Sequence, residues 1–355
     1  MSAITEPAPA KINLALHVRR RRADGYHDLE TLFAFATDGD TITVERAPEN
    51  SLEITGPFAA ALLPSASAAP NWTPASAGAA AETTPVVTAS AGFVTVPTGA
   101  STATPTPSTG PSPSTPTTPA MAGAQSGAAD NEPPRPSTPT QAPWHGNLVT
   151  AAADAFTAEF APTAHHAITL EKRLPIASGI GGGSADAAAT LRALARLHAV
   201  PETDPRLHDI AAKLGADVPA CLANRTTLGT GKGDTLTNLE GLADTPLLLV
   251  NPNVAVSTAA VFKAWGGQDR GPIPEGDLLA RATAGRNDLE PPALALAPVI
   301  ADVRHLLDAA DGVLLSRMSG SGATCFALFE TPEARDAAAH AAQARGWWTL
   351  ATTLA

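Results

Sequence analysis

The chain has 355 residues and a formal net charge of -11 at pH 7. This acidic balance argues against binding to nucleic acid or to an anionic membrane surface, both of which attract basic proteins. No apolar run reaches the roughly 20 residues of a membrane span, and the first residues lack the basic and apolar pattern of a signal peptide. Cys221 and Cys325 lie far apart in apolar stretches, as free thiols do in a reducing compartment. We therefore expect a cytoplasmic protein. As separate expectations, the chain is a monomer or a weak homodimer and its partner is a small molecule.

The first predicted strand covers residues 12–18, where apolar and polar side chains alternate. Lys11 precedes this strand, and the pattern alone predicts a solvated strand end there, because lysine is mostly exposed in proteins. Four arginines follow at residues 19–22, which we interpret as a solvated turn rather than a basic patch, since the chain is acidic overall. Two further strands are predicted over residues 31–36 and 41–46.

The composition changes over residues 57–143. This stretch holds 17 of the 33 prolines and only four charged side chains. Such a segment cannot bury enough apolar surface to offset its conformational entropy, so we predict a disordered insertion rich in Pro, Ser, Thr and Ala. A glycosylated stalk and a docking segment for partners are alternative interpretations of the same composition.

Beyond the insertion, a helix is predicted over residues 147–160. A strand over 167–173, a glycine-rich loop over 174–188 and a helix to His198 follow. Closely spaced glycines let the backbone approach a ligand, and free N–H groups at a helix N-terminus favour an anion such as phosphate. Ser184 is a plausible N-cap of this helix. The loop is neither a Walker A sequence nor a good dinucleotide fingerprint, and a tight turn without a ligand remains an alternative.

The rest of the chain is predicted to alternate between short helices and strands. A helix over 205–214 ends at Gly215, after which Asp217 is either an N-cap or a turn residue, and a second glycine-rich turn covers 228–234. The C-terminal elements are strand 247–251, helix 257–265, helical stretch 286–309, strand 312–317, strand 323–329, helix 332–345 and strand 347–353. This order predicts an α+β sandwich of the ferredoxin-like kind.

Several stretches together resemble one protein family. Residues 9–14 (PAKINL), the loop at 174–188 and residues 319–323 (SGSGA) resemble the three motifs of the GHMP small-molecule kinases. Within that superfamily, residues 23–27 (ADGYH) and 215–219 (GADVP) are similar to the 4-diphosphocytidyl-2-C-methyl-D-erythritol kinases. The resemblance covers the chain from about residue 8 to 329, apart from the insertion.

The resemblance implies a fold and a reaction. The fold is a two-domain α+β structure. Residues 1–56 and 144–243 would form an ATP-binding domain like the second domain of ribosomal protein S5, and residues 244–355 a ferredoxin-like domain, with the active site between them. The reaction is the ATP-dependent phosphorylation of the 2-hydroxyl of 4-(cytidine 5'-diphospho)-2-C-methyl-D-erythritol, in the non-mevalonate route to isoprenoid precursors.

The resemblance also implies roles for individual residues. Asp217 would be the general base for the acceptor hydroxyl, and Lys11 would orient that hydroxyl and stabilise developing charge. We expect positioning to contribute more than basicity, because a carboxylate beside an ammonium is a weak base. The ATP triphosphate, with Mg2+ bridging its oxygens, would lie on a loop made of Pro175, Ile176, Ala177, Ser178, Gly179, Ile180, Gly181, Gly182, Gly183, Ser184 and Ala185. Asn147 and Lys172 match positions near the adenine.

For the acceptor, Tyr26 and Phe262 match two rings that sandwich the cytosine, and His27 matches the residue that hydrogen-bonds its edge. Asn13 would lie near the methylerythritol. A ring sandwich reads the flat base, and edge hydrogen bonds distinguish cytosine from uracil.

Two departures from the family pattern and two alternative functions remain. The insertion lies between an N-terminal strand and the helix that carries Asn147. Asp186 occupies a position where some members have Asn, and it would repel phosphates unless it points away or reaches the metal.

Another GHMP kinase, such as a homoserine or mevalonate-type kinase, shares the loop but has no need of a Tyr-His pair. A scaffold whose Ser/Thr/Pro tract docks partners is the alternative that does not involve catalysis.

Overall fold

The computed structural model describes residues 3–62 and 140–355. Most of the predicted insertion, and with it the expectation of disorder, lies outside these residues. At its two ends the described chain is regular, since α1 (Ala59–Leu62) and β4 (Thr140–Ala142) lie inside the range 57–143. Regular structure therefore extends further into this stretch than the composition predicts.

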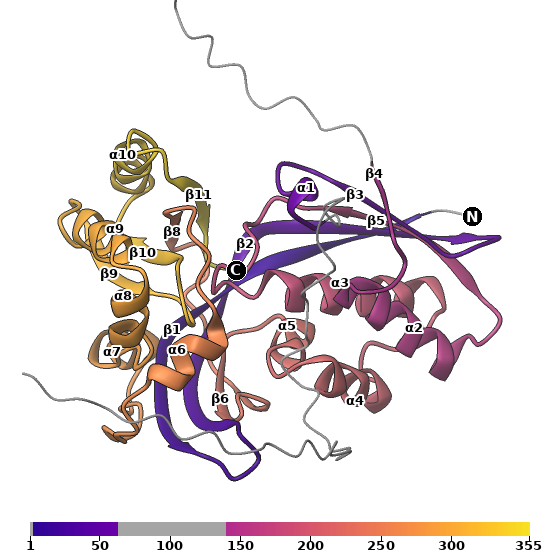
Figure 1. The fold of residues 1–355 in the computed structure, drawn as a ribbon, viewed down its shortest axis with the longest axis horizontal. Helices are drawn as coiled ribbons and strands as arrows, with labels where there is room; N and C mark the ends of the chain where they lie inside the picture. Colours follow the sequence, from indigo (N-terminus) through magenta and orange to yellow (C-terminus); the bar gives the residue numbers. More distant parts are fainter. Residues whose placement is uncertain (1–2, 63–139) are drawn as a thin grey trace, which may run out of the picture. The chain divides into compact units, whose positions relative to one another are not determined.

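The N-terminal sheet is built on two long antiparallel strands, β1 (Ile4–Arg21) and β2 (His27–Ala47), shown in indigo in Figure 1. β1 pairs along β2, and the remaining strands follow the order β4-β3-β5-β2-β6-β7. The other strands of this sheet are β3 (Ser51–Thr55), β5 (His165–Glu171), β6 (Thr227–Gly231) and β7 (Thr235–Asn238).

The prediction of two separate strands over 31–36 and 41–46 is wrong, because β2 continues through Gly39. Pairing with β1 shifts register between Pro9 and Lys11, a β-bulge that absorbs the extra residues of β2. Opposite this bulge, a Cβ at Gly39 would lie 2.7 Å from Pro9 Cα. Local composition suggests a turn at this point, whereas cross-strand pairing keeps the strand extended.

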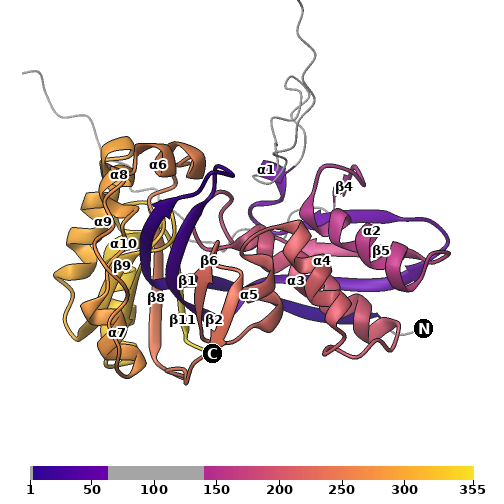
Figure 2. The same ribbon diagram turned by 90° about the horizontal axis from the view of Figure 1, so that it is seen from below.

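Four helices cover one face of this sheet, as the two views in Figures 1 and 2 show. They are α2 (Leu148–Phe160), α3 (Gly182–Leu197), α4 (Pro205–Leu214) and α5 (Val218–Ala223). α3 packs against β1, β2, α2 and α5, so it is the central helix. Its buried residues are largely alanine, which lets neighbouring elements approach closely. Phe33, Phe156 and Leu170 fill the core between sheet and helices.

The C-terminal half is a four-stranded antiparallel sheet in the order β11-β8-β10-β9. Its strands are β8 (Pro246–Asn251), β9 (Val313–Met318), β10 (Cys325–Phe329) and β11 (Trp348–Thr353). Helices α9 (Val299–Asp308) and α10 (Pro332–Gln343) contact the sheet, while α6 (Thr258–Ala264), α7 (Leu278–Ala284) and α8 (Glu290–Leu296) lie in the long connection from β8 to β9. This βαββαβ arrangement confirms the predicted α+β fold.

Helical structure over 286–309 is interrupted, contrary to the prediction of one stretch. α8 ends at Leu296 and α9 begins at Val299, with Pro298 as the N-cap of α9. Proline lacks the N–H that a continuous helix would need at this point, so the chain starts a new helix instead.

The C-terminal sheet is buried on both faces. In β8, Leu248 and Val250 belong to the core shared with α9 and α10. Their neighbours Leu247 and Leu249 belong to a core shared with β1 and β2. Because side chains alternate along a strand, one strand contributes to both cores. The two halves of the described chain are therefore joined by apolar packing.

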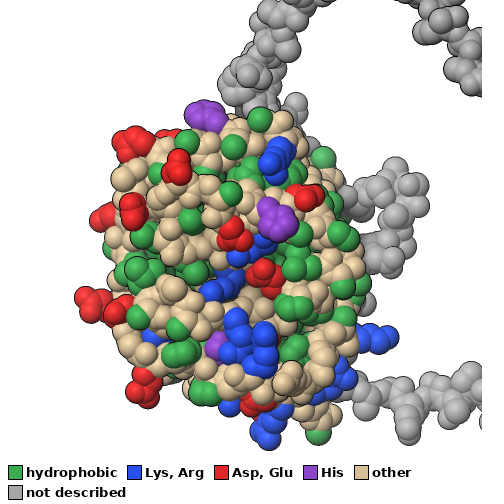
Figure 3. Space-filling view, turned by 90° about the vertical axis from the view of Figure 1, so that its left-hand side faces the viewer, with side chains coloured by type: hydrophobic (Ala, Val, Ile, Leu, Met, Phe, Trp, Pro, Cys, Tyr) green, Lys and Arg blue, Asp and Glu red, His purple; other side chains and the backbone are tan. Residues whose placement is uncertain are grey.

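The arginines at residues 19–22 do not form a turn, since β1 continues to Arg21. Arg19 is paired with Glu30 at 2.7 Å and with Asp269 at 3.0 Å, and Arg20 is paired with Asp28. On the face drawn in Figure 3, Lys and Arg side chains gather near the centre with Asp and Glu side chains beside them. The ion pairs of Arg19 and Arg20 with acidic side chains agree with the interpretation that the arginines are not a basic patch.

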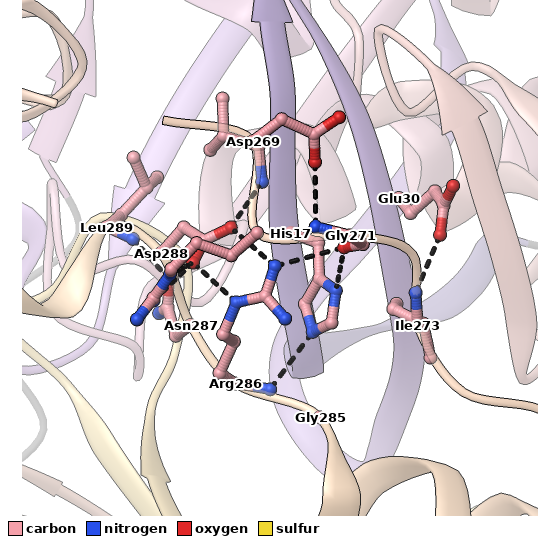
Figure 4. A network of polar contacts seen from close by, with 12 residues as sticks. His17, Glu30, Asp269, Gly271, Ile273, Gly285, Arg286, Asn287, Asp288 and Leu289 are labelled. Atoms are coloured by element: carbon pink, nitrogen blue, oxygen red, sulfur yellow. Dashed lines mark hydrogen bonds and ion pairs between the residues drawn. The ribbon is translucent and has the colours of Figure 1, made fainter. Parts of the chain in front are cut away.

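The segment that leads from α6 to α8 is fastened to β1 by polar contacts (Figure 4). His17 Nδ1 donates to Gly271 O at 3.0 Å, and its Nε2 accepts the Arg286 N–H at 3.1 Å, which requires a neutral ring. Burial lowers the pKa of His17 and favours that neutral form. Asp288 accepts the Val18 N–H at 2.9 Å.

None of the helices within 3–62 and 140–355 is long and apolar enough to cross a membrane.

Candidate active site

The fold brings the three motif stretches into contact. The glycine loop between β5 and α3 lies against β1, since the Lys11 N–H donates to Ile180 O at 3.0 Å. It also lies against the turn after β9, because Ser319 Oγ donates to Gly179 O at 2.9 Å and the Thr324 N–H donates to Ser178 O at 3.1 Å. Residues from the two ends of the chain thus hold the loop at its centre.

The loop has a backbone conformation that favours glycine. Gly179 and Gly181 have φ values of +79° and +66°. A Cβ at Gly181 would lie 2.9 Å from Lys11 Cε, and one at Gly179 would lie 2.5 Å from Ser319 O. Both glycines therefore combine a left-handed backbone with a close approach of neighbouring atoms.

The prediction of Ser184 as N-cap is wrong. α3 begins at Gly182 with Gly181 as its N-cap, so Ser184 lies inside the first turn. Within the described structure, the first-turn N–H groups of Gly182, Gly183 and Ser184 have no hydrogen-bond partner. Such groups at the start of a 16-residue helix are suited to binding an anion, because free N–H donors there are aligned with the helix dipole.

Lys11 and Asp217 form an ion pair beside this loop. Lys11 Nζ lies 3.0 Å from Asp217 Oδ2, and the two side chains are 4% and 39% exposed. The expectation of a solvated Lys11 is therefore wrong, because the bulged strand β1 runs under α3 and α5. Asp217 precedes α5 and makes no side-chain cap, so its carboxylate remains directed to Lys11. One member of the pair is enclosed while the other is open to a ligand.

Asn13 extends this group. Lys11 Nζ donates to Asn13 Oδ1 at 3.1 Å, and Asn13 Nδ2 donates to Thr31 Oγ1 at 2.8 Å. The Asn13 N–H donates to Ser319 Oγ at 3.2 Å, the same hydroxyl that holds the glycine loop. The ammonium is thus held from two sides, by Asp217 and by Asn13, and Asn13 is itself held by Thr31 and Ser319.

The remaining predicted donor-site residues differ in whether they face an open site or are held in the interior. The Lys172 ammonium is buried and donates to Asp40 and to Asp186, so it is not directed to an open site. Asp186 consequently points away from the start of α3. Of the two ways in which Asp186 could avoid repelling phosphates, pointing away or reaching the metal, the structure shows the first. Asn147 caps α2 by accepting the Val149 N–H at 2.9 Å. The start of α2 is next to the loop, since Leu148 Cδ1 would be 3.6 Å from a Cβ at Gly183.

Aromatic side chains gather where β1 and β2 meet α6. The His27 ring lies 4.8 Å from the Phe262 ring and 5.6 Å from the Trp265 ring, measured between centroids. Burial and the charge of Arg21 lower the pKa of His27, so its ring is neutral at physiological pH. The Lys232 ammonium lies over the Tyr26 ring, with Nζ 5.1 Å from the ring centroid.

Sequence reasoning assigned no role to Lys232 or Trp265. A single lysine in a glycine-rich turn carries no local signal. Trp265 follows Phe262 by three residues, a spacing that would put both on one face of the helix predicted over 257–265 and that could have placed Trp265 in the same group. In the structure α6 ends at Ala264, and Trp265 is its C-cap.

Comparison with known proteins agrees with this geometry. A family profile described as "GHMP kinases N terminal domain" matches residues 147–225, and one described as "GHMP kinases C terminal" matches residues 275–346. The described chain is similar in structure to a solved 4-(cytidine 5'-diphospho)-2C-methyl-D-erythritol kinase. The TM-score is 0.64 and the identity 29%, over 99% of this chain and 98% of the other. A homoserine kinase from Cytophaga hutchinsonii is 16% identical with a TM-score of 0.58, a likeness of fold alone.

Curated relatives are more similar in sequence. The 4-diphosphocytidyl-2-C-methyl-D-erythritol kinase of Rhizorhabdus wittichii is 45% identical over 99% of this chain and 94% of its own length. That of Novosphingobium aromaticivorans is 40% identical over 99% of this chain and 93% of its own length. With its motifs assembled around one loop and relatives of this identity along its whole length, the chain belongs to the 4-diphosphocytidyl-2-C-methyl-D-erythritol kinase family of the GHMP kinases.

Proposed function

We propose that this chain transfers the terminal phosphoryl group of ATP to the 2-hydroxyl of 4-(cytidine 5'-diphospho)-2-C-methyl-D-erythritol. The observation that carries the proposal is the Lys11–Asp217 ion pair beside the anion-binding start of α3. Phosphoryl transfer requires in-line positioning and stabilisation of charge on the transferred group, with little covalent chemistry from the protein. A fixed ammonium and an accessible carboxylate next to a phosphate loop supply these two requirements.

Each member of the pair has a distinct role in this mechanism. Asp217, the more exposed partner, accepts the proton of the acceptor hydroxyl. Lys11 orients the hydroxyl and stabilises the negative charge that develops during transfer. Asn13 holds the ammonium from the other side and contributes to the surface that receives the methylerythritol.

The phosphoryl donor occupies the loop from Pro175 to Ala185, with its phosphates at the first-turn N–H groups of α3. Asn147, at the start of the adjacent helix, is next to the adenine in this proposal. Lys172 supports the loop from beneath rather than contacting the donor directly, because its ammonium is held by two aspartates.

The proposed cofactor is Mg2+, which would accompany the phosphates of ATP. Among the residues that the structure describes, no three His, Cys, Asp or Glu side chains are grouped to hold a metal ion. Asp186, the acidic residue in the first two turns of α3, is committed to Lys172. Magnesium usually keeps several waters and takes few protein ligands when it accompanies nucleotide phosphates, so the residues present fit this role. When bound, the ion neutralises charge on the phosphates.

The cytidyl group is assigned to the side chains of Tyr26, His27, Phe262 and Trp265, which we call the aromatic cluster. Tyr26 and Phe262 supply ring faces for the cytosine, and His27 supplies a hydrogen-bonding edge. His27 already lies against Phe262, which holds both side chains in place. Residues 1–56 and 144–243 are assigned to the ATP-binding domain and 244–355 to the second domain, which contributes Phe262 to the acceptor site.

The test is steady-state turnover with matched variants. The wild-type chain is assayed for ADP release with ATP, Mg2+ and the cytidyl substrate, and with the same polyol lacking the cytidyl group or with homoserine. Asp217→Asn should lower kcat by at least about 100-fold while nucleotide binding persists. Asp209→Asn, an exposed carboxylate on α4, is the control and should leave kcat unchanged. Full turnover in Asp217→Asn contradicts the base assignment, and turnover with homoserine alone contradicts the acceptor.

A further inference from the structure

Three charged side chains are buried against the glycine loop. Lys172 follows β5, Asp40 lies in β2 and Asp186 lies in the second turn of α3. Lys172 Nζ donates to Asp40 Oδ2 at 2.5 Å and to Asp186 Oδ2 at 2.7 Å. The side chains of Lys172, Asp40 and Asp186 are 3%, 0% and 4% exposed. We call these three residues the buried triad.

The buried triad contacts both ends of the loop. At the beginning, Asp40 Oδ1 accepts the N–H groups of Arg173 at 2.6 Å and of Leu174 at 2.8 Å. At the end, a Cβ at Gly182 would lie 3.0 Å from Lys172 Nζ, so the ammonium lies directly under the first residue of α3. The position of the phosphate-binding N–H groups therefore depends on where the ammonium is held.

The charges of the buried triad do not cancel when all three groups are ionised. One ammonium faces two carboxylates, and within the described residues the buried Asp186 Oδ1 has no hydrogen-bond partner. An uncompensated buried charge is costly. Burial, together with the charge of Asp40, raises the pKa of Asp186 to about 8 despite the opposing effect of Lys172. Burial favours a neutral Lys172, but the two carboxylates outweigh it and raise the pKa of the ammonium.

Few other groups can influence Asp186. Among the described residues, the charged groups that face it are Lys172 from the end of β5 and Asp40 from β2. The nearby titratable group on α5 is the Cys221 thiol, whose pKa burial raises to about 12, so it remains neutral. The proton on Asp186 therefore depends on the buried triad and on whatever charge arrives at the loop.

We propose that Asp186 is a positioning residue for the phosphoryl donor, which holds the Lys172 ammonium under the glycine loop and takes up a proton from solvent when the nucleotide binds. This inference rests on the proposed function. Phosphates at the start of α3 bring negative charge close to a carboxylate in the second turn of the same helix, which favours its neutral form. Protonation at Oδ1 leaves Oδ2 as the acceptor for Lys172, so the contact under the loop persists.

The test is proton-linked nucleotide binding. A non-hydrolysable ATP analogue with Mg2+ is titrated into the full chain by calorimetry at pH 8, in buffers of different ionisation enthalpy. The wild-type chain should take up a fraction of one proton per nucleotide, and Asp186→Asn should take up none. Between pH 8 and 9 the wild-type affinity should fall, by at most about tenfold per pH unit, whereas that of Asp186→Asn should stay constant.

Glu6→Gln is the matched control. Glu6 is another buried carboxylate that contacts α3, through Arg192 at 3.3 Å, but it lies away from the loop. This variant should keep the wild-type proton uptake. A wild-type chain that binds the analogue without proton uptake, or an Asp186→Asn chain with equal uptake, overturns the inference.

If Asp186→Asn does not fold, the titration of the wild-type chain at pH 8 still tests the inference, because binding of the analogue without proton uptake overturns it. A folded wild-type chain that binds no nucleotide overturns the proposed function itself. Binding without proton uptake overturns the role of Asp186 alone, so the two failures are distinguishable.

Discussion

Gly179→Ala should destabilise the chain and weaken its donor site. Gly179 has a φ of +79°, and a Cβ there would lie 2.5 Å from Ser319 O and 2.8 Å from Gly322 O. A left-handed backbone costs an alanine about 1–2 kcal/mol. Both close atoms belong to the backbone of the turn after β9, so that turn must move, at a cost of about 1–3 kcal/mol. We expect the free energy of unfolding to fall by about 2–5 kcal/mol in total.

Gly346→Ala separates the two contributions. Gly346 has a nearly equal φ of +75°, but nothing lies within 4 Å of a Cβ there. This control should lose only the backbone part, about 1–2 kcal/mol. Urea unfolding measures both variants, and the KM for ATP should rise in Gly179→Ala alone. A difference in unfolding free energy below about 0.5 kcal/mol between the variants would refute the argument that the turn after β9 holds the loop.

Three further predictions concern catalysis, specificity and pH. Lys11→Met should lower kcat by about 100-fold or more in steady-state assays, since it removes the ammonium that Asp217 and Asn13 share, and an unchanged kcat would contradict this. Tyr26→Ala should raise the KM for the cytidyl substrate more than the KM for ATP, because a ring face is lost; equal effects would count against the aromatic cluster. His166 is buried, and burial together with the charge of His198 lowers its pKa to about 4. The unfolded chain therefore binds more protons between pH 6.5 and 4, and the free energy of unfolding should fall over that window by at most about 3 kcal/mol, as urea unfolding at several pH values would measure. His166→Phe should flatten this pH dependence.

Local patterns predicted the four strands of the C-terminal half and the helix α10, whereas α7 and the break between α8 and α9 were not predicted. The continuous apolar runs of β8 and β10, and the proline and threonine at the start of α10, are signals carried by residues a few positions apart. Where local signals failed in the N-terminal half, a distant contact was the cause. Pairing of β1 with β2 carries the strand through Gly39, and the position of Gly181 against Lys11 moves the start of α3 away from Ser184.

The motif residues and their order were sufficient to identify the family, because a phosphate loop and its flanking helix are encoded within about twenty neighbouring residues. Tertiary structure alone decided three features of the site. It buries Lys11 against Asp217, places Lys232 over Tyr26, and turns Asp186 away from the anion site onto Lys172. Lys172 and Asp40 are 132 residues apart in the chain. A contact across such a separation leaves no trace in local periodicity, since it exists only once the sheet and helix have packed together.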